Sequence, residues 1–347
     1  MKLKCLETVP ELDRMIGEAN AVTIVIHTHP DGDAVGSGLA MKHYLEECRR
    51  KDVVLVAPDR IPDTLAFLTR DERGLLVYDE DPAKAAGRIA ASDLLICQDF
   101  NAFNRAERAE AALAGSQASK VLIDHHLNPD SGAFRLVFST PDISSTCELL
   151  YWIFKELPDI AGDPRRLPGT SRNALLAGMT TDTNNFANSV FPGTLEMASE
   201  LLAAGVDRDA ILSELYNNYR ENRLRLMGYL LQEKMRITPE GAAYMILTRE
   251  ETERFGTGEG ETEGFVNLPL SLATVRLSLF LKEDDGHFRV SLRSKRGISA
   301  NACAMEYFNG GGHEMAAGGK LFFPEDIPSP SEAEAYILKA TERFFRQ

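Results

Sequence analysis

The 347-residue sequence contains no apolar run close to the roughly 20 residues that a membrane-spanning helix requires. Its first residues also lack the long apolar segment and the cleavage site of a signal peptide. The five cysteines are scattered, odd in number and without a Cys-x-x-Cys pair, which favours reduced, packed thiols over disulfides or a zinc site. We therefore expect a cytoplasmic protein that does not enter a membrane.

Basic residues are also in short supply. Lys and Arg number 38 against 52 Asp and Glu, which gives a formal net charge of −14 at pH 7. Binding to long nucleic acid without regard to sequence needs a basic face, so we expect no such partner. Metal ions and a few local Arg or His residues can still make one cleft positive, and a small anionic substrate is compatible with this charge.

The first part of the chain alternates apolar, strand-like runs with helix-like segments. Strands that are buried on both faces and separated by helices predict a parallel α/β sheet. A chain of this length is also expected to form two domains rather than one. The expected strands are 22–27, 53–57, 94–99 and 121–124, and the expected helices include 34–49 and 104–112.

The later part predicts a helical segment and then a second, smaller α/β domain. The dipeptide Asp285-Gly286 between two alternating segments predicts a hairpin. Ser145 and Glu148 have the spacing of a capping box that opens a helix. We expect a first domain over 1–205, a helical connector over 206–235 and a second domain over 236–347, with the active site in the cleft between the two domains.

Acidic and histidine residues gather where the predicted elements end. In a parallel sheet, ligands bind beyond the carboxyl ends of the strands, where His27, Asp99 and Asp124 are expected. Hard divalent ions prefer carboxylate oxygen and imidazole nitrogen. Each segment alone is also compatible with a polar turn or a surface loop, but together they predict a two-metal cleft. The segments are His27-Thr28-His29-Pro30-Asp31-Gly32-Asp33, Asp124-His125-His126 and Thr181-Asp182-Thr183.

Three successive glycines, Gly310 to Gly312, precede His313 and allow two interpretations. They let the backbone approach a ligand closely and present N–H groups to an anion, with Arg293 on the polar face of a strand. Alternatively, they form a helix C-cap and turn after a helix at 300–308, and Arg293 is a solvated charge.

In this order, the motifs resemble the DHH phosphoesterase superfamily, and within it the group of bifunctional oligoribonucleases and 3′-phosphoadenosine 5′-phosphate (pAp) phosphatases. One departure is the segment 184–189, where relatives commonly have Gly or Ser before the Phe and an aromatic residue or Arg soon after. The residues that carry the resemblance are His27-x-x-Pro30-Asp31-x-Asp33, Asp99, Asp124-His125-His126-Leu127-Asn128, Thr181-Asp182-Thr183, Gly310-Gly311-Gly312-His313 and Ala316-Ala317-Gly318.

The resemblance implies a site for two Mn²⁺ ions, with Mg²⁺ or Co²⁺ as substitutes. It also implies that His126 contacts the substrate phosphate and that Asp124 orients a histidine. The implied metal ligands are His27 and Asp31 for one ion, Asp33, His125 and Asp182 for the other, and Asp99 as the bridge. The implied substrate-binding residues are Arg293, Ser294, Asn301, Gly311, Gly312 and His313.

Two ions roughly 3.5–4 Å apart lower the pKa of a bound water and clamp phosphoryl oxygens. The resemblance therefore implies an enzyme that hydrolyses short oligoribonucleotides or dinucleotides such as pApA to mononucleotides and removes the 3′-phosphate of pAp. Short RNA or small nucleotides are the expected partners, and a homodimer is compatible with the sequence. The alternatives are an exopolyphosphatase or pyrophosphatase that uses the same metal site, and a nucleotide sensor without catalysis.

Overall fold

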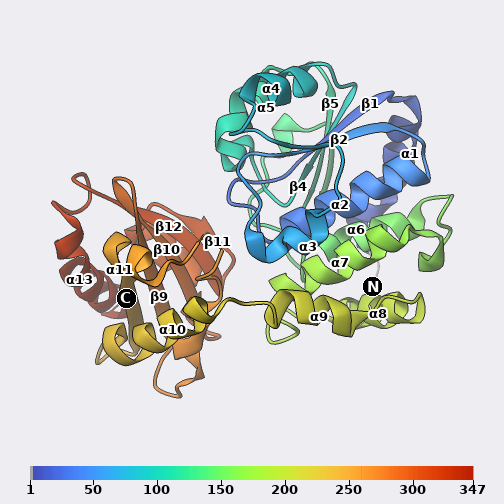
Figure 1. Ribbon diagram of the computed structural model, residues 1–347. Coiled ribbons are helices and arrows are strands. Elements are labelled where there is room, and N and C mark those ends of the chain that lie inside the picture. Colours follow the sequence, from blue (N-terminus) through green and yellow to red (C-terminus); the bar gives the residue numbers. More distant parts are fainter. Residues whose placement is uncertain (1–2, 259, 347) are drawn as a thin grey trace. The chain divides into compact units, whose positions relative to one another are not determined.

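The computed structural model describes residues 3–258 and 260–346 of the chain. The chain divides into two compact units, the first ending at Asn218 and the second beginning at Tyr219 (Figure 1). This division falls inside the segment that the sequence predicts as a helical connector. Across the described residues, none of the helices combines the length and the apolar character needed to span a bilayer.

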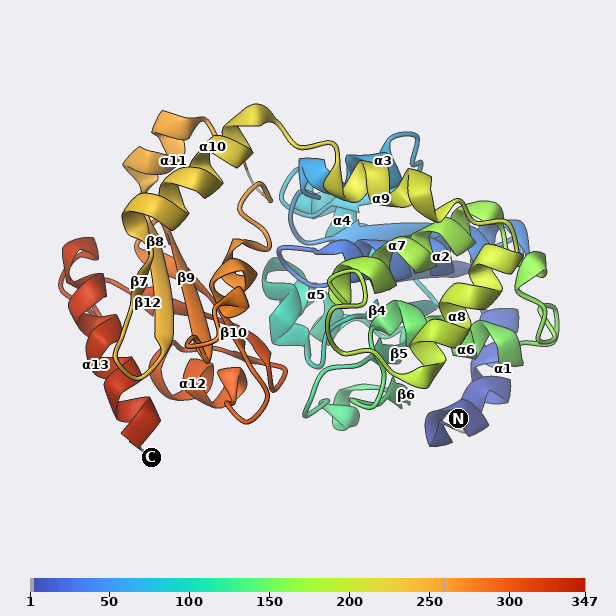
Figure 2. The same ribbon diagram turned by 90° about the horizontal axis from the view of Figure 1, so that it is seen from below.

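A six-stranded parallel sheet forms the centre of the first unit, in the order β3-β2-β1-β4-β5-β6. Its central strands are buried on both faces because helices cover both, which confirms the predicted α/β class (Figure 2). The four predicted strands are the central ones, whereas the short edge strands β3 and β6 were not predicted. The strands are β1 (Ala21–Val25), β2 (Asp52–Ala57), β3 (Leu75–Val77), β4 (Leu94–Gln98), β5 (Ser119–Asp124) and β6 (Leu136–Ser139).

The helices of the first unit lie in two layers. The layer containing α1, α2, α6, α7 and α8 shares one apolar core with one sheet face, and α4 and α5 share a second core with the other face. The helices are α1 (Val9–Glu18), α2 (Gly32–Glu47), α3 (Ala66–Thr69), α4 (Pro82–Ala90), α5 (Glu110–Gly115), α6 (Thr146–Glu156), α7 (Gly169–Asp182), α8 (Pro192–Ala203) and α9 (Arg208–Tyr216).

The single helix predicted over 104–112 is wrong. The chain instead forms a 3₁₀ segment over Phe103–Ala109, and α5 begins only at Glu110. Glu107 has a φ of 36°, outside the right-handed helical region, so the backbone is broken in the middle of the predicted helix.

The second unit contains a mixed sheet in the order β11-β12-β10-β9-β8-β7. The predicted hairpin is confirmed, because β9 and β10 pair antiparallel around Asp285-Gly286 and Gly286 has a φ of 72°. One sheet face packs on α12 and α13, and the other packs on α10 and the turn at Phe265–Ser271. The elements are β7 (Arg236–Ile237), β8 (Ala242–Leu247), β9 (Leu277–Asp284), β10 (His287–Ser294), β11 (Gly311–Gly312), β12 (Ala316–Phe322), α10 (Glu221–Tyr229), α11 (Arg249–Phe255), α12 (Ala300–Tyr307) and α13 (Ala333–Arg346).

Helices α2 and α7 approach each other closely because glycines lie at their contact. A Cβ atom added to Gly178 of α7 would overlap the thiol of Cys147 on α6 and lie 2.9 Å from the carbonyl oxygen of Gly32 on α2. Backbone atoms cannot move aside as a flexible side chain can, so only glycine fits at this position without displacing a helix. The contact holds the start of α2 against the C-terminal half of α7, whose last residue is Asp182.

We expect Gly178→Ala to lower the free energy of unfolding of the first unit by about 1–3 kcal/mol, because overpacking forces helices apart. Urea unfolding followed by the fluorescence of Trp152 measures this, since the only tryptophan lies on α6. Gly87→Ala on α4 is the matched control, because nothing lies within 4 Å of its added Cβ, and it should be neutral or stabilise by up to about 1 kcal/mol. Equal unfolding midpoints for the two variants would contradict the packing argument.

Candidate metal and substrate site

His27 and Asp31 lie in the loop between β1 and α2. The Nδ1 atom of His27 donates to the carbonyl oxygen of Thr28 at 2.7 Å, which leaves Nε2 available as a ligand. Nε2 lies 3.8 Å from Asp31 Oδ1 and 3.4 Å from Asp99 Oδ2. Asp31 is the N-cap of α2, and its Oδ1 accepts hydrogen bonds from the backbone N–H groups of Asp33 and Ala34 at 3.0 and 3.1 Å. The cap therefore fixes where this carboxylate points.

A second group surrounds His125, which follows β5. Its Nε2 atom lies 3.7 Å from Asp33 Oδ2 and 3.5 Å from Asp182 Oδ2. Asp33 is in the first turn of α2 and Asp182 is the last residue of α7, so the glycine contact between these helices brings the two carboxylates to one histidine.

Asp99 lies between the two groups, directly after β4. Its Oδ2 faces His27, and its Oδ1 lies 3.5 Å from Nε2 of His125. The residue is 1% exposed and has a φ of 63°, a left-handed conformation that is uncommon outside glycine. In each of two triads, one ligand atom per residue lies within 4.8 Å of the others, a separation that small side-chain rotations bring within reach of one ion. The triads are His27, Asp31, Asp99 and Asp33, His125, Asp182.

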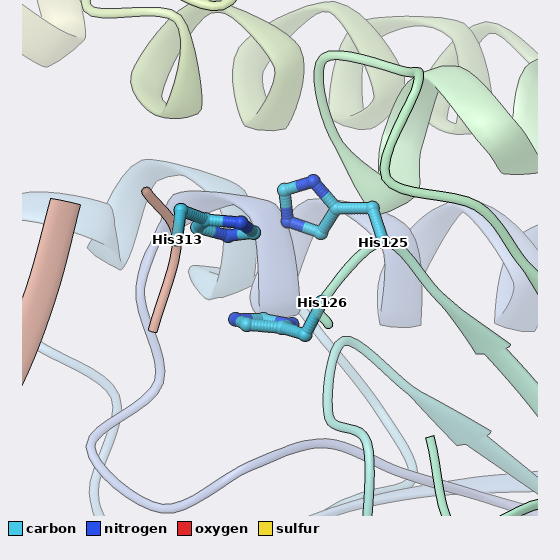
Figure 3. Close-up of side chains that lie close together, drawn as sticks. All are labelled: His125, His126 and His313. Atoms are coloured by element: carbon cyan, nitrogen blue, oxygen red, sulfur yellow. The ribbon is translucent and has the colours of Figure 1, made fainter. Parts of the chain in front are cut away.

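His126 differs from His125 in its partner, although the two follow each other in the chain. Figure 3 shows their rings, whose centroids are 4.9 Å apart and whose planes are inclined by 69°. Nδ1 of His126 donates to Oδ1 of the fully buried Asp124 at 2.7 Å. Asp99, Asp124 and His126 also have one potential ligand atom each within 4.8 Å of the others, but Asp124 and His126 are already bonded directly to each other. The geometry suits a histidine that is oriented by a carboxylate.

The start of α6 donates two hydrogen bonds to the Asp33 carboxylate. Asp33 Oδ2 accepts from the N–H of Thr146 at 2.7 Å, and Oδ1 accepts from the N–H of Cys147 at 2.9 Å. Helix N-termini have unsatisfied N–H groups and favour negative charge, so Asp33 and α6 stabilise each other. The predicted helix start at Ser145 is confirmed, because its hydroxyl accepts from the N–H of Glu148. The reciprocal bond of a capping box, from the N–H of Ser145 to Glu148, was predicted wrongly. The Glu148 carboxylate accepts from the N–H of Ser144 instead.

Two further residues at the site were not found from the sequence. Thr146 donates from its hydroxyl to Asp99 Oδ1 at 2.9 Å and is fully buried. Asp59, after β2, accepts from the N–H of His29 at 2.6 Å and from the hydroxyl of Thr28, so it holds the loop that carries His27. Asp59 follows an apolar strand just as Asp99 does, which is a signal that the sequence did contain.

The loop after Asp182 has an unusual backbone. Asn184, Asn185 and Phe186 have φ values of 47°, 55° and 66°, so three successive residues are left-handed. Asparagine tolerates this conformation better than most residues, which suits it to the two positions before Phe186. Arg208 donates to Asn185 Oδ1 at 2.6 Å and fixes the loop.

The residues expected to bind substrate in the second unit gather around α12 and the β11–β12 hairpin. Asn301 Oδ1 accepts from the N–H of Gly312 at 2.8 Å, and the N–H of His313 donates to Ala316 O at 2.7 Å. Gly311 and Gly312 form strand β11 rather than a helix cap, although the N–H of Gly310 does bond to Ala304 O at the end of α12.

The two remaining residues of that expected set lie on β10. Arg293 donates to its neighbouring carbonyl at Leu292, at 2.9 Å. Ser294, 7% exposed, donates to Ile298 O at 2.6 Å and so ties the end of the strand to the following turn.

The charges at the first-unit site are strongly coupled. Burial lowers the pKa of His27, but its hydrogen bonds to Asp31 and Asp99 outweigh this effect and raise the pKa to about 10. Burial acts in the same way on His125, and the carboxylates of Asp182 and Asp99 raise its pKa nevertheless. Without metal, protons on the two histidines therefore balance part of the negative charge.

Asp182 behaves in the opposite way. Burial, supported by repulsion from Asp31 and Asp99, raises its pKa to about 6 against the attraction of His125. The folded state thus binds the Asp182 proton more tightly than the unfolded chain does, and the contribution of this one group to the stability of the metal-free protein is lost as the pH rises from about 4 through about 6.

We expect Asp182→Asn to stabilise the metal-free protein at pH 7, because the amide needs no ionisation. A one-unit pKa shift corresponds to about 1.4 kcal/mol, and partial exposure of the side chain (24%) limits the gain to roughly 1–2 kcal/mol. Urea unfolding in chelator at pH 7 and below pH 4 measures it, and the gain should vanish at the lower pH. The exposed Asp63→Asn is the control, and a loss of stability in Asp182→Asn at pH 7 would contradict the argument.

Comparison with known proteins identifies the family. Residues 21–179 match the N-terminal domain of the DHH family, and residues 242–345 match the DHHA1 domain. A bifunctional oligoribonuclease and PAP phosphatase NrnA from Thermus thermophilus is 30% identical over 305 residues, which cover 86% of this chain and 84% of the relative. A cyclic-di-AMP phosphodiesterase PdeA from Listeria monocytogenes is 28% identical over 96% of this chain and 49% of that protein.

Among solved structures, an exopolyphosphatase-related protein from Bacteroides fragilis has 35% sequence identity and a TM-score of 0.89, with 100% of this chain and 98% of that chain covered. The resemblance that the sequence motifs indicate is thereby confirmed. The chain belongs to the DHH family of metal-dependent phosphoesterases, and it carries the DHH N-terminal domain followed by the DHHA1 domain.

Proposed function

We propose that this protein hydrolyses the ester bond between phosphorus and the ribose 3′ oxygen in short oligoribonucleotides, in dinucleotides such as pApA and in pAp, with two Mn²⁺ ions. The observation that carries the proposal is the position of Asp99, whose two carboxylate oxygens face two different histidine-containing triads. A carboxylate in that position suits a bridge between two ions.

The donor set fits two hard divalent ions. His27, Asp31 and Asp99 would hold one ion, and Asp33, His125, Asp182 and Asp99 the other. Four carboxylates suit Mg²⁺ and Mn²⁺, and the two imidazoles favour Mn²⁺. Oδ2 of Asp124, a buried carboxylate oxygen that no donor among the described residues reaches, also favours positive charge nearby.

A pair of such ions activates water and neutralises the phosphoryl oxygens during in-line displacement. The protein itself orients the metal ligands. Asp31 is fixed by its cap at α2, Asp33 by two N–H groups of α6 and His27 by its bond to the Thr28 carbonyl. Ligands that are held in this way require little rearrangement during the reaction.

His126 is the proposed contact for the substrate phosphate. Its Nδ1 atom is bonded to Asp124, so the orientation of the ring is set before substrate binds, and Nε2 is the atom proposed to reach a phosphate oxygen. Asp124 thus acts through His126 and contacts no substrate itself.

All the proposed substrates share the ester bond between phosphorus and the ribose 3′ oxygen. In pApA and in pAp, water attacks phosphorus, the bond to the 3′ oxygen breaks and that oxygen takes up a proton. The products are two molecules of AMP from pApA, and AMP with orthophosphate from pAp. The cyclic dinucleotide that names the Listeria relative contains the same bond, so it belongs in the same test. Arg293, Asn301, Gly311, Gly312 and His313 are the proposed groups for the nucleotide part, with Ser294 supporting them.

We expect Mn²⁺-dependent release of AMP from pApA and pAp and of mononucleotides from RNA of two to five residues, with turnover abolished by a chelator and restored by Mn²⁺. Asp99→Asn should lower kcat/KM by at least about 100-fold, because the bridging carboxylate is lost. Liquid chromatography of the products measures these rates, with cyclic-di-AMP, pyrophosphate and polyphosphate assayed alongside. Purified protein with Mn²⁺ that turns over no nucleotide substrate would refute the proposal.

We further expect Asp124→Asn to lower kcat roughly 100-fold while Mn²⁺ binding stays within a few-fold of wild type, because Asp124 orients His126 and is not a proposed ligand. Steady-state kinetics and calorimetric titration with Mn²⁺ separate the two effects. The exposed Asp130→Asn in the following loop is the control. Loss of both ions in Asp124→Asn would assign it to the metal site instead.

Hydrolysis of polyphosphate or pyrophosphate is the second candidate, and the Bacteroides structure described as exopolyphosphatase-related is the observation that favours it. Orthophosphate release from these substrates without any nucleotide turnover would support it. A cytoplasmic location and a homodimer stay predictions from the sequence.

A further inference from the structure

Thr146, the first residue of α6, makes one hydrogen bond to each of two candidate metal ligands. Its backbone N–H donates to Asp33 Oδ2 at 2.7 Å, and its hydroxyl donates to Asp99 Oδ1 at 2.9 Å. Its side chain is fully buried, so both bonds are shielded from water. One residue at a helix terminus thereby connects the carboxylate of α2 with the carboxylate that follows β4.

We propose that Thr146 is a positioning residue that sets the rotation of the Asp99 carboxylate and, with it, the spacing of the two ions. The inference rests on the two-ion site of the proposed function and goes beyond it by assigning a residue that is not itself a ligand. Residues that orient metal ligands typically change metal affinity or activity 10–100-fold when they are removed.

Because the Thr146 hydroxyl bonds to only one oxygen of Asp99, the two oxygens have different neighbours. Oδ1 accepts from Thr146 and lies 3.5 Å from Nε2 of His125, whereas Oδ2 lies 3.4 Å from Nε2 of His27. Oδ1 also lies 3.8 Å from Nδ1 of His126, so several groups compete for this oxygen. Without the hydroxyl, the carboxylate plane would be held only by these longer contacts with the histidines.

The bond from the backbone N–H of Thr146 to Asp33 fixes the position of Asp33 relative to Asp99. Because both bonds start from one residue, the distance between the two carboxylates is limited by the size of a single threonine. Thr146 is anchored in turn by α6, whose first turn is capped by Ser145. The spacing is therefore set by a helix terminus that is capped and buried.

Thr146→Val tests this, because valine has nearly the same shape, retains the N–H bond to Asp33 and removes only the donor to Asp99. Thr146→Ser retains the hydroxyl and should restore wild-type behaviour. Thr341→Val is the matched control: Thr341 is also fully buried and donates to a backbone carbonyl, Ile337 O, at 2.8 Å. Calorimetric titration with Mn²⁺ gives stoichiometry and affinity, and electron paramagnetic resonance reports whether two bound Mn²⁺ ions are magnetically coupled.

We expect wild type, Thr146→Ser and Thr341→Val to bind two coupled ions. Thr146→Val should bind Mn²⁺ about 10–100-fold more weakly and show the spectrum of isolated ions. If Thr146→Val only unfolds at a lower temperature while Mn²⁺ affinity and coupling stay at wild-type values, Thr146 has a purely structural role and the inference is overturned. Should Thr146→Val not fold, Thr146→Ala removes the same donor without adding bulk and is judged by the same measurements.

The proposed function fails in a different way. A wild-type protein that binds two coupled ions, with coupling lost in Thr146→Val, but that hydrolyses no nucleotide supports the positioning role and contradicts the nucleotide substrate. A wild-type protein that hydrolyses nucleotides, with Thr146→Val equal to Thr146→Ser in affinity and coupling, overturns only the role of Thr146.

Discussion

Asp33 connects three helices through its carboxylate and its backbone, and the arrangement of the site depends on that junction. Asp33 belongs to the first turn of α2, accepts two N–H groups from the start of α6 and lies beside Gly178 of α7. A carboxylate at a helix N-terminus satisfies donors that would otherwise be unpaired and lies at the positive end of the helix dipole. The same interaction therefore closes the core and presents one oxygen-rich side chain to the strand ends.

Ionising Asp33 at that junction is electrostatically unfavourable. Burial and the nearby charges of Asp99 and Asp182 raise the pKa of Asp33, so the metal-free fold resists ionisation of the groups that a metal needs. Asp99 has a lowered pKa in spite of its burial, because His125 and His27 bond to it. Sites of this kind oppose stability, and the apolar cores on both faces of the sheet have to offset them.

The sequence predicted the residues at strand ends well, for a simple reason. Parallel strands have their carboxyl ends at one edge, so an acid or histidine after an apolar run is placed there by topology alone. His27, Asp99 and Asp124 follow this rule, and the central strands were confirmed with boundaries within a few residues. Asp182 was identified only through its motif, because a helix end gives no comparable signal.

What the sequence did not predict comes from contacts between distant segments. Thr146 is 47 residues from Asp99 and 113 from Asp33 in the sequence, and no local sequence pattern predicts its hydrogen bond to either residue. Glu148 has the spacing of a capping box but bonds to Ser144, because the buried carboxylate finds donors outside its own turn. In the hairpin of the second unit, Gly312 directs its N–H to Asn301, a pairing that the run of glycines does not reveal.

The two sets of residues differ in how their backbone is held, and this bears on what each can specify. Asp31, Asp33 and Asp182 are attached to the ends of regular helices, and Asp99 to the end of a central strand. Residues on such elements are placed more narrowly than residues on loops, which suits a reaction that tolerates little misplacement. His313, by contrast, lies in the turn between β12 and the two-residue strand β11. In the proposed function the first unit would define which bond breaks, and the short hairpin of the second unit would contact the part of the substrate that varies.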